Sequence, residues 1–326
     1  MNRRALMSGA AVGGAGLLAA TAIRAQGAWP HGKPIRVIIP WPPGAANDTL
    51  GRLLAQRLGE KLGATAVPEN RTGGAGLVGT NAVLQAAPDG YTLLASAFNT
   101  AVMPLVLKGA TFDPQRDLEV MARTARAPLV MVMTGGRPQR TLAEVIAAAK
   151  AKPREWSFAI SSLGSAGHLA TIEFNRRTGA DLDMVTYRGT QPALTDLMSG
   201  SAHLLIDPSF ALLPATGDGR VRALGIAAAE RSRLAPDLPT MGEAGLPGYE
   251  FQSWYGVWSP KGTPAEICQR VNALMVETMR DPAVVQRLTG QVLEPVTESI
   301  EETRGFIGAE IARATELLRS VNYQPE

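Results

Sequence analysis

The sequence predicts an α/β protein with two lobes and a ligand cleft between them. Segments with the pattern of strands alternate with amphipathic helical patterns along most of the chain, which is typical of parallel sheets covered by helices. The length of 326 residues favours two lobes over one. Two segments that combine proline with charge, 122–128 and 231–239, separate strong elements and are expected to cross between the lobes. Two crossings make a hinge.

The individual elements follow from the hydrophobic period of each segment. The expected strands are 35–39, 65–68, 92–95, 129–133, 157–160, 184–187, 203–206 and 223–227. The expected helices are 49–62, 77–86, 142–150, 169–178, 191–199, 265–279, 282–288 and 299–321. We therefore expect one discontinuous lobe, 26–125 plus 235–326, and a second lobe, 126–234, inserted into it.

Residues 1–25 have the pattern of an export signal. Arg3 and Arg4 precede a stretch of small and apolar residues, 7–22, that is too short and too weakly hydrophobic for a convincing membrane span. Cleavage is expected after Ala22 or Ala25. The arginine pair fits twin-arginine export, and ordinary Sec export stays open. The mature chain is expected in the periplasm and, because no later run is long and apolar enough, not to span the membrane.

Charge and cysteine content exclude several classes. The net charge of +3 includes Arg3, Arg4 and Arg24, so that removal of the signal leaves a chain with no net charge. This argues against nucleic acid as a partner. Cys268 is the single cysteine, which excludes an intramolecular disulfide, and its helical context predicts a packing residue.

The loop after the first expected strand, 40–48, is the most informative segment. Its prolines and glycine fix the shape of the loop, and a helix follows at once, with Asn47 or Asp48 as the expected N-cap. Free backbone N–H groups at a helix N-terminus bind anions. The alternative is a rigid turn that binds nothing.

Three further loops follow expected strands at their carboxyl ends, the edge where open α/β sheets bind ligands. They are 69–76, 161–168 and 187–192, and in the last of them Thr190 is the expected N-cap. Glycine, serine and threonine dominate these loops. Such loops offer backbone and hydroxyl donors with few charges, which suits a carboxylate held by hydrogen bonds and helix dipoles.

Other kinds of site have weaker support. The glycines of 74–79 match G-x-G-x-x-G, but they do not directly follow a strand and no acidic residue stands at the required distance. Ser165 and His168 are close enough in sequence for a secreted serine hydrolase, yet no G-x-S-x-G or S-x-x-K motif occurs. One cysteine and three scattered histidines give no metal-ligand spacing. We expect no metal and no cofactor.

Single residues near these loops have two interpretations each. Asp207 ends an apolar strand and either points into the cleft or caps the following turn. Trp41 is expected to form a wall of the pocket, whereas Trp254 and Tyr255 are expected to pack at the junction of the lobes.

Taken together, the loops resemble those of the Bug-type extracytoplasmic solute receptors, the binding components of tripartite tricarboxylate transporters. The resemblance covers essentially the whole mature chain. It rests on these landmarks in order: 40–44 with Asp48, 69–71 followed by glycines, 87–93, 164–165 with 168–169, 187–189, 238–240 with 243–245, and 248–250 ahead of Trp254.

The resemblance implies a type II periplasmic-binding-protein fold whose lobes close on a small organic carboxylate. It implies a receptor without catalysis, expected to be a monomer, that delivers its ligand to a membrane permease; a ligand-sensing adaptor for a membrane signalling protein stays as an alternative. The implied ligand-binding residues are Trp41, Pro43, Gly44, Ala45, Ala46, Asn47, Ser161, Ser162, Ser165, His168, Tyr187, Arg188, Gly189, Thr190 and Asp207.

The chain departs from the family pattern in the first loop. Trp41 stands where phenylalanine is frequent, and Gly44 with Ala45 replaces a glycine pair. The methyl group of Ala45 limits close backbone approach. The larger aromatic side chain of Trp41 favours a ligand with an apolar or aromatic body.

Overall fold

The computed structural model describes residues 29–233 and 235–326, so the expected export signal lies outside the described residues. The strands are β1 Ile35–Ile39, β2 Ala66–Asn70, β3 Thr92–Ala97, β4 Leu118–Thr134, β5 Ser157–Ile160, β6 Asp183–Thr186, β7 Leu204–Pro208, β8 Val221–Ile226, β9 Gln252–Pro260 and β10 Glu294–Pro295. The helices are α1 Ala46–Leu62, α2 Leu77–Leu84, α3 Phe98–Val106, α4 Leu142–Ala151, α5 Ala166–Thr178, α6 Thr190–Ser199, α7 Ser209–Leu212, α8 Ala265–Arg280, α9 Pro282–Thr289 and α10 Ile300–Ser320, with short 3₁₀ turns at Gly74–Gly76, Pro153–Glu155 and Leu213–Thr216.

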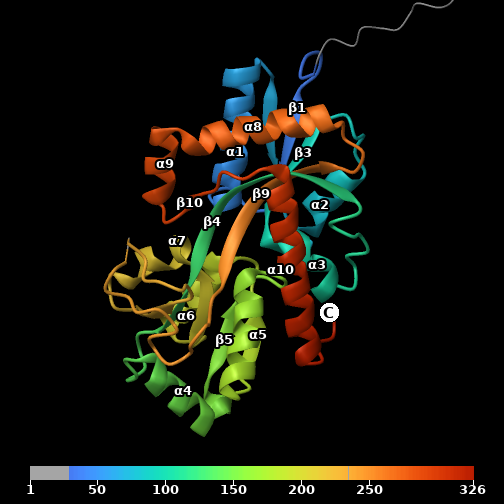
Figure 1. The fold of residues 1–326 in the computed structure, drawn as a ribbon. Helices are drawn as coiled ribbons and strands as arrows, with labels where there is room; N and C mark the ends of the chain where they lie inside the picture. The colour runs from blue at the N-terminus through green and yellow to red at the C-terminus, as the bar shows by residue number, and fades with distance from the viewer. Residues whose placement is uncertain (1–28, 234) are drawn as a thin grey trace, which may run out of the picture.

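The structure confirms the two-lobe α/β architecture (Figure 1). In the first lobe, β1 pairs in parallel with β2 and β3, and β3 pairs antiparallel with β9. In the second lobe, β5 pairs in parallel with β6 and β7, and β7 pairs antiparallel with β4. Each sheet is therefore mixed, and not purely parallel as expected, because β4 and β9 run against their neighbours.

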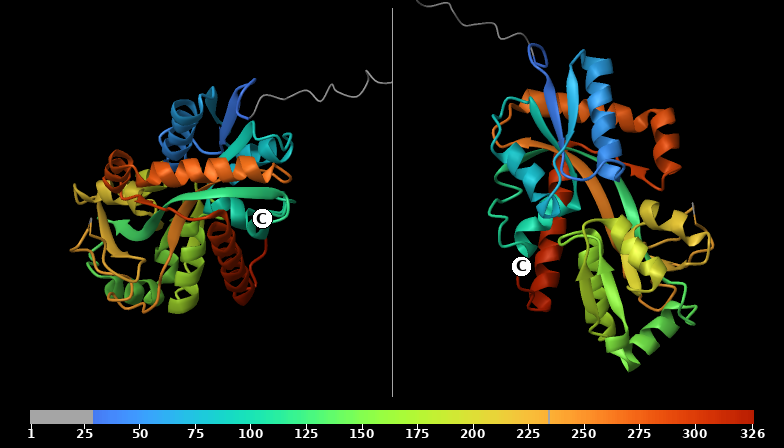
Figure 2. Two further views of the ribbon diagram at one scale, coloured as in Figure 1. Left: turned by 45° about the horizontal axis from the view of Figure 1, so that its top comes forward. Right: turned by 180° about the vertical axis from the view of Figure 1, so that it is seen from behind.

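Strand β4 joins the two sheets. The sequence analysis expected a strand only at 129–133 and a loop crossing at 122–128, but the strand begins at Leu118. Its residues up to Pro128 pair antiparallel with β9, and from Leu129 onward it pairs with β7. Strand β9 was not predicted, because all but one of its residues are buried and the sequence shows no polar–apolar alternation. Together β4 and β9 form a continuous ribbon between the lobes (Figure 2).

The place where the chain changes lobe follows from these registers. The segment 231–239 returns to the second sheet, since the Ile226 amide donates to the Pro239 carbonyl at 2.9 Å. The Phe251 amide then donates to Ala227 in the second lobe, and Gln252 already pairs with Pro128 in the first. The predicted boundaries near 125 and 235 stay a prediction, and from the registers we propose crossings at 128/129 and 251/252.

Helix α10 lies along both lobes. It contacts α3 and β4 as well as α5, and Figure 1 shows it descending from the first sheet beside the second lobe. Its Arg313 guanidinium lies 4.5 Å from the centre of the Phe251 ring, next to the second crossing. Beyond the helix, the Glu326 amide donates to the Val106 carbonyl at 3.0 Å, and the Tyr323 ring packs edge-on against His168.

Aromatic side chains fill the junction of the lobes. Trp254 is fully buried, and its ring contacts Phe98, Trp258 and Phe306 at centroid distances of 5.6–6.0 Å. This confirms the predicted packing role of Trp254. Cys268 is buried in the apolar cluster beneath α8, also as predicted, and burial raises the pKa of its thiol.

Gly167, in the first turn of α5, tests how closely that helix packs on β7. A Cβ at this position would lie 2.0 Å from the Ile206 carbonyl oxygen and 3.0 Å from the Asp207 carboxylate, so Gly167→Ala must push the helix from the strand. We expect a loss of about 1–3 kcal/mol in the free energy of unfolding, measured by urea titration. Gly305→Ala in α10 is the control, since its Cβ would meet open space; equal stability of the two variants would contradict this packing.

Candidate ligand-binding site

The loop between β1 and α1 is fixed by hydrogen bonds to the Asp48 carboxylate. The Asp48 carboxylate accepts from the Gly44 amide at 3.0 Å, from Arg52 at 2.9 Å and from the Asn70 side chain at 2.9 Å. Burial alone would raise the pKa of Asp48, but these hydrogen bonds outweigh it and the pKa lies below its usual value. The expected N-cap was wrong: Ala45 occupies that position, without a side-chain bond, and Asp48 instead fixes the shape of the loop.

The loop before α5 is held by His168. Ser165 is the N-cap, and its Oγ accepts from the His168 amide at 3.0 Å. The His168 ring in turn accepts at Nδ1 from the Gly164 amide at 3.1 Å. Burial lowers the pKa of His168 to about 4, so the ring is neutral at pH 7. Because Ser165 Oγ is the acceptor in its bond with the His168 amide, its own hydrogen stays free to donate.

The loop before α6, residues 187–192, is connected to the loop before α5 through Asp207. The Gly189 amide donates to the Ser161 carbonyl at 2.8 Å, and Gly189, not the expected Thr190, is the N-cap of α6. The Asp207 carboxylate accepts from the Ser161 hydroxyl at 2.9 Å and from the Thr190 hydroxyl at 2.5 Å. Asp207 is 2% exposed, and burial raises its pKa to about 6 even though both hydroxyls oppose this shift.

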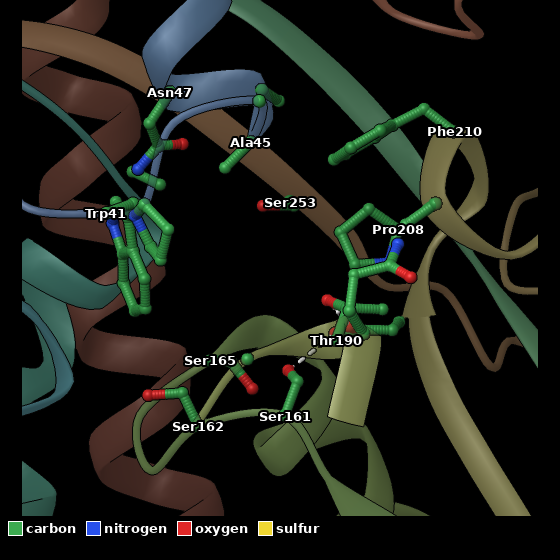
Figure 3. Close-up of a pocket in the computed structure, with 18 of the residues that line it drawn as sticks. Trp41, Ala45, Asn47, Ser161, Ser162, Ser165, Thr190, Pro208, Phe210 and Ser253 are labelled. Atoms are coloured by element: carbon green, nitrogen blue, oxygen red, sulfur yellow. Dashed lines mark hydrogen bonds between the residues drawn. The ribbon is translucent and has the colours of Figure 1, made fainter. Parts of the chain in front are cut away.

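These loops surround a cavity of about 640 Å³ between the lobes (Figure 3). It contains most of the residues expected at the site: Trp41, Pro43, Gly44, Ala45, Ala46, Asn47, Ser161, Ser162, Ser165, Arg188, Gly189, Thr190 and Asp207. Asp207 belongs to this wall, with its carboxylate bonded to Ser161 and Thr190, and a contact between Asp207 and a ligand stays a prediction.

Two of the expected residues stand behind the wall of the cavity. His168 is 1% exposed and points toward Gly164 and Tyr323. The Tyr187 hydroxyl donates to Asp196 at 2.7 Å, on α6. The structure thus corrects the expectation that their side chains line the site; they support the loops that do.

The wall also contains residues that the sequence analysis did not select. They are Pro42, Ala97, Asn99, Ala166, Gln191, Pro192, Pro208, Phe210, Ala211, Pro214, Ser253 and Tyr255. Five of them lie on α3, α7 or β9, elements that were not predicted: Asn99, Phe210, Ala211, Ser253 and Tyr255. The signal available for Phe210 was its place directly after the strand that ends in Asp207.

Three helices point their N-termini at the cavity. Ala46 and Asn47 begin α1, Ala166 begins α5, and Thr190 and Gln191 begin α6, all in the wall. First-turn amides have no partner within their own helix, and the helix dipole makes this end positive. Arg188 is the one cationic side chain among the described lining residues, and it makes no ion pair or hydrogen bond with a described residue. The cavity therefore favours an anion.

Sequence comparison assigns the family. A model described as "Tripartite tricarboxylate transporter family receptor" matches residues 50–323. The protein BugT of Bordetella pertussis is 37% identical over 289 residues, 88% of this chain and 89% of the relative. The chain belongs to the tripartite tricarboxylate transporter receptor family. Members are solute-binding receptors, not enzymes.

Solved structures of other members have the same fold. A structure described as R. palustris Rpa4515 with adipate is 33% identical, with a TM-score of 0.86 over 91% of this chain and 100% of that one. MatC from Rhodopseudomonas palustris, described with bound malate, is 29% identical, with a TM-score of 0.79 over 87% of this chain and 98% of that one. The periplasmic binding protein BugD, 27% identical, has a TM-score of 0.81 over 90% of this chain and 99% of that one.

Further properties concern only the described residues. Within 29–233 and 235–326, no helix combines the length and apolar character needed to cross a bilayer. In the same ranges, histidine, cysteine and acidic side chains form no group of three or more that could hold a metal ion.

The buried carboxyl of Asp207 generates a pH dependence of stability. In the unfolded chain this group ionises near its ordinary value of 3.8, whereas in the folded protein its pKa is about 6. Between these values the folded state binds more protons, so Asp207 destabilises the fold progressively as pH rises from about 4 to about 6. We expect Asp207→Asn to abolish this part of the pH profile.

The measurement is urea unfolding of the wild type and Asp207→Asn at several pH values. Subtracting the two profiles removes groups that titrate alike in both proteins. The difference should change between pH 4 and pH 6 and be level above pH 7. A difference that is constant over the whole range would contradict the burial of an ionisable Asp207.

Proposed function

We propose that this protein is a periplasmic receptor that captures a small organic carboxylate between its lobes and delivers it to the membrane permease of a tripartite transporter. The observation that carries the proposal is the convergence of three helix N-termini and Arg188 on one cavity. The relatives described with adipate and malate support a carboxylate as the ligand.

Binding proceeds by closure of the lobes around the anion. The loop after β1 belongs to the first lobe, whereas Ser165 and Arg188 belong to the second, so each lobe offers half of the site. A carboxylate that bridges both halves stabilises the closed form by its differential affinity for that form. The closed form then docks to the permease.

Export fits this role. The arginine pair and the apolar stretch of 7–22 form the signal that we propose directs the chain to the periplasm, with removal at or before residue 25. The expected monomer stays part of the proposal.

The proposal predicts stabilisation by carboxylates. The mature protein, unfolded and refolded to remove any bound molecule, is heated in the presence of mono-, di- and tricarboxylates and of neutral amides of the same size. A ligand at about 100 times its Kd adds about 2.7 kcal/mol, which raises the midpoint by a few degrees. Stabilisation by carboxylates but not by the amides is expected. No shift with any carboxylate would overturn the proposal.

Ser165 provides a residue-level test with a matched control. Ser165→Ala removes a hydroxyl donor from the cavity, and a hydrogen bond to a charged ligand is worth enough for a loss of about tenfold or more in affinity. Both Ser165 and Ser299 are N-caps, of α5 and α10, so alanine at either costs about 1 kcal/mol of stability. Calorimetric titration with the carboxylate found above should show weaker binding only for Ser165→Ala. Equal affinities of the two variants would remove Ser165 from the site.

A further inference from the structure

Two aromatic side chains face the cavity from opposite sides. Trp41, from the loop of the first lobe, lies on one side, and Phe210, from α7 of the second lobe, lies on the other beside Pro208 (Figure 3). Between them the floor is formed by serine side chains, Ser161 and Ser165 among them. Pro42, Pro43, Pro192, Ala211 and Pro214 add apolar surface to the wall, which also contains the polar side chains of Asn47, Asn99, Gln191 and Ser253. The cavity thus combines an apolar slot between Trp41 and Phe210 with polar groups around it.

The polar floor carries two kinds of group. Beside Asp207, the Ser161 and Thr190 hydroxyls both donate to the carboxylate and so offer only oxygen lone pairs to a ligand. These two hydroxyls suit a ligand hydroxyl group or a water molecule.

Other donors in the wall are free. Ser165 Oγ accepts from the His168 amide and keeps its own hydrogen available, and Ala166 begins α5 beside it. Arg188 supplies the one cationic side chain among the described lining residues. A ligand carboxylate can bind to these groups.

We infer that the ligand is an aromatic carboxylate, whose carboxylate binds at Ser165 and Arg188 and whose ring lies between Trp41 and the Phe210–Pro208 side. The inference rests on the proposed function and names its substrate class. Flat rings on opposing aromatic side chains gain contact beyond their buried area.

The test is calorimetric titration of the refolded mature protein with benzoate, phenylacetate, cyclohexanecarboxylate and adipate. We expect benzoate or phenylacetate to bind at least tenfold more tightly than adipate, and cyclohexanecarboxylate, which has no flat ring, to bind more weakly than benzoate. Phe210→Ala should weaken the aromatic acid about tenfold and change adipate less than twofold. Phe210→Leu, which keeps an apolar side chain, should have an affinity for the aromatic acid between those of the wild type and Phe210→Ala. It replaces Phe210→Ala if that variant fails to fold.

The outcomes separate this inference from the proposed function. The inference of an aromatic ligand would be overturned if adipate bound as tightly as the aromatic acids, or if the Phe210 variants lost affinity equally for both ligands. The proposed function as a carboxylate receptor would be unaffected by either result. Failure of all four acids and of every other carboxylate to bind would overturn both. A loss of affinity for the aromatic acid but not for adipate in both Phe210 variants supports a ring between Trp41 and Phe210.

Discussion

The antiparallel pairing of β4 with β9 is the constraint on which the rest of the structure depends. Residues 118–128 of β4 pair with 252–260 of β9, and the same strand β4 then continues from Leu129 into the sheet of the second lobe. Because one strand belongs to both sheets, the ends of β1 and β3 in one lobe and of β5 and β7 in the other face a common space. The cavity lies in that space, and its polar wall consists mostly of the loops that leave those strands and β6, together with Ser253 on β9. Helix α10 reinforces the joint, since it contacts both lobes beside the crossing.

The site uses backbone and hydroxyl groups in place of paired charges. Asp48 and His168 do not touch a ligand in this arrangement; they fix the loops that present amides and Ser165. The use of backbone and hydroxyl donors has a physical reason. A rigid loop at a helix N-terminus binds an anion without the entropy cost of ordering long cationic side chains. Asp207 joins two of these loops, because its buried carboxyl accepts from both Ser161 and Thr190.

Sequence reasoning predicted three of the loops that line the cavity, whereas the fourth predicted loop, 69–76, does not line it. Glycine, serine and threonine loops at the ends of β1, β5 and β6 could be recognised locally, since turn residues and helix starts carry their own signals. Side-chain direction was not encoded in this way. His168 and Tyr187 lie in the same loops as lining residues, yet they turn to Gly164 and Asp196 because hydrogen-bond partners stand there in the folded chain. Ala45 is the N-cap because α1 begins at Ala46, so that Asn47 and Asp48 lie inside its first turn, and the Asp48 carboxylate accepts from Gly44, Arg52 and Asn70.

The sequence by itself determined the α/β class and the family, and it predicted three of the loops that line the cavity and an anionic ligand, because each depends on short patterns within one segment. Only the tertiary structure decided that β4 extends through the expected crossing, that β9 pairs with it, and that Phe210 faces Trp41 across the cavity. Those features depend on contacts between segments far apart in the chain. A strand buried on both faces shows no alternation, and an aromatic residue on a one-turn helix shows no period, so neither leaves a local signal to read.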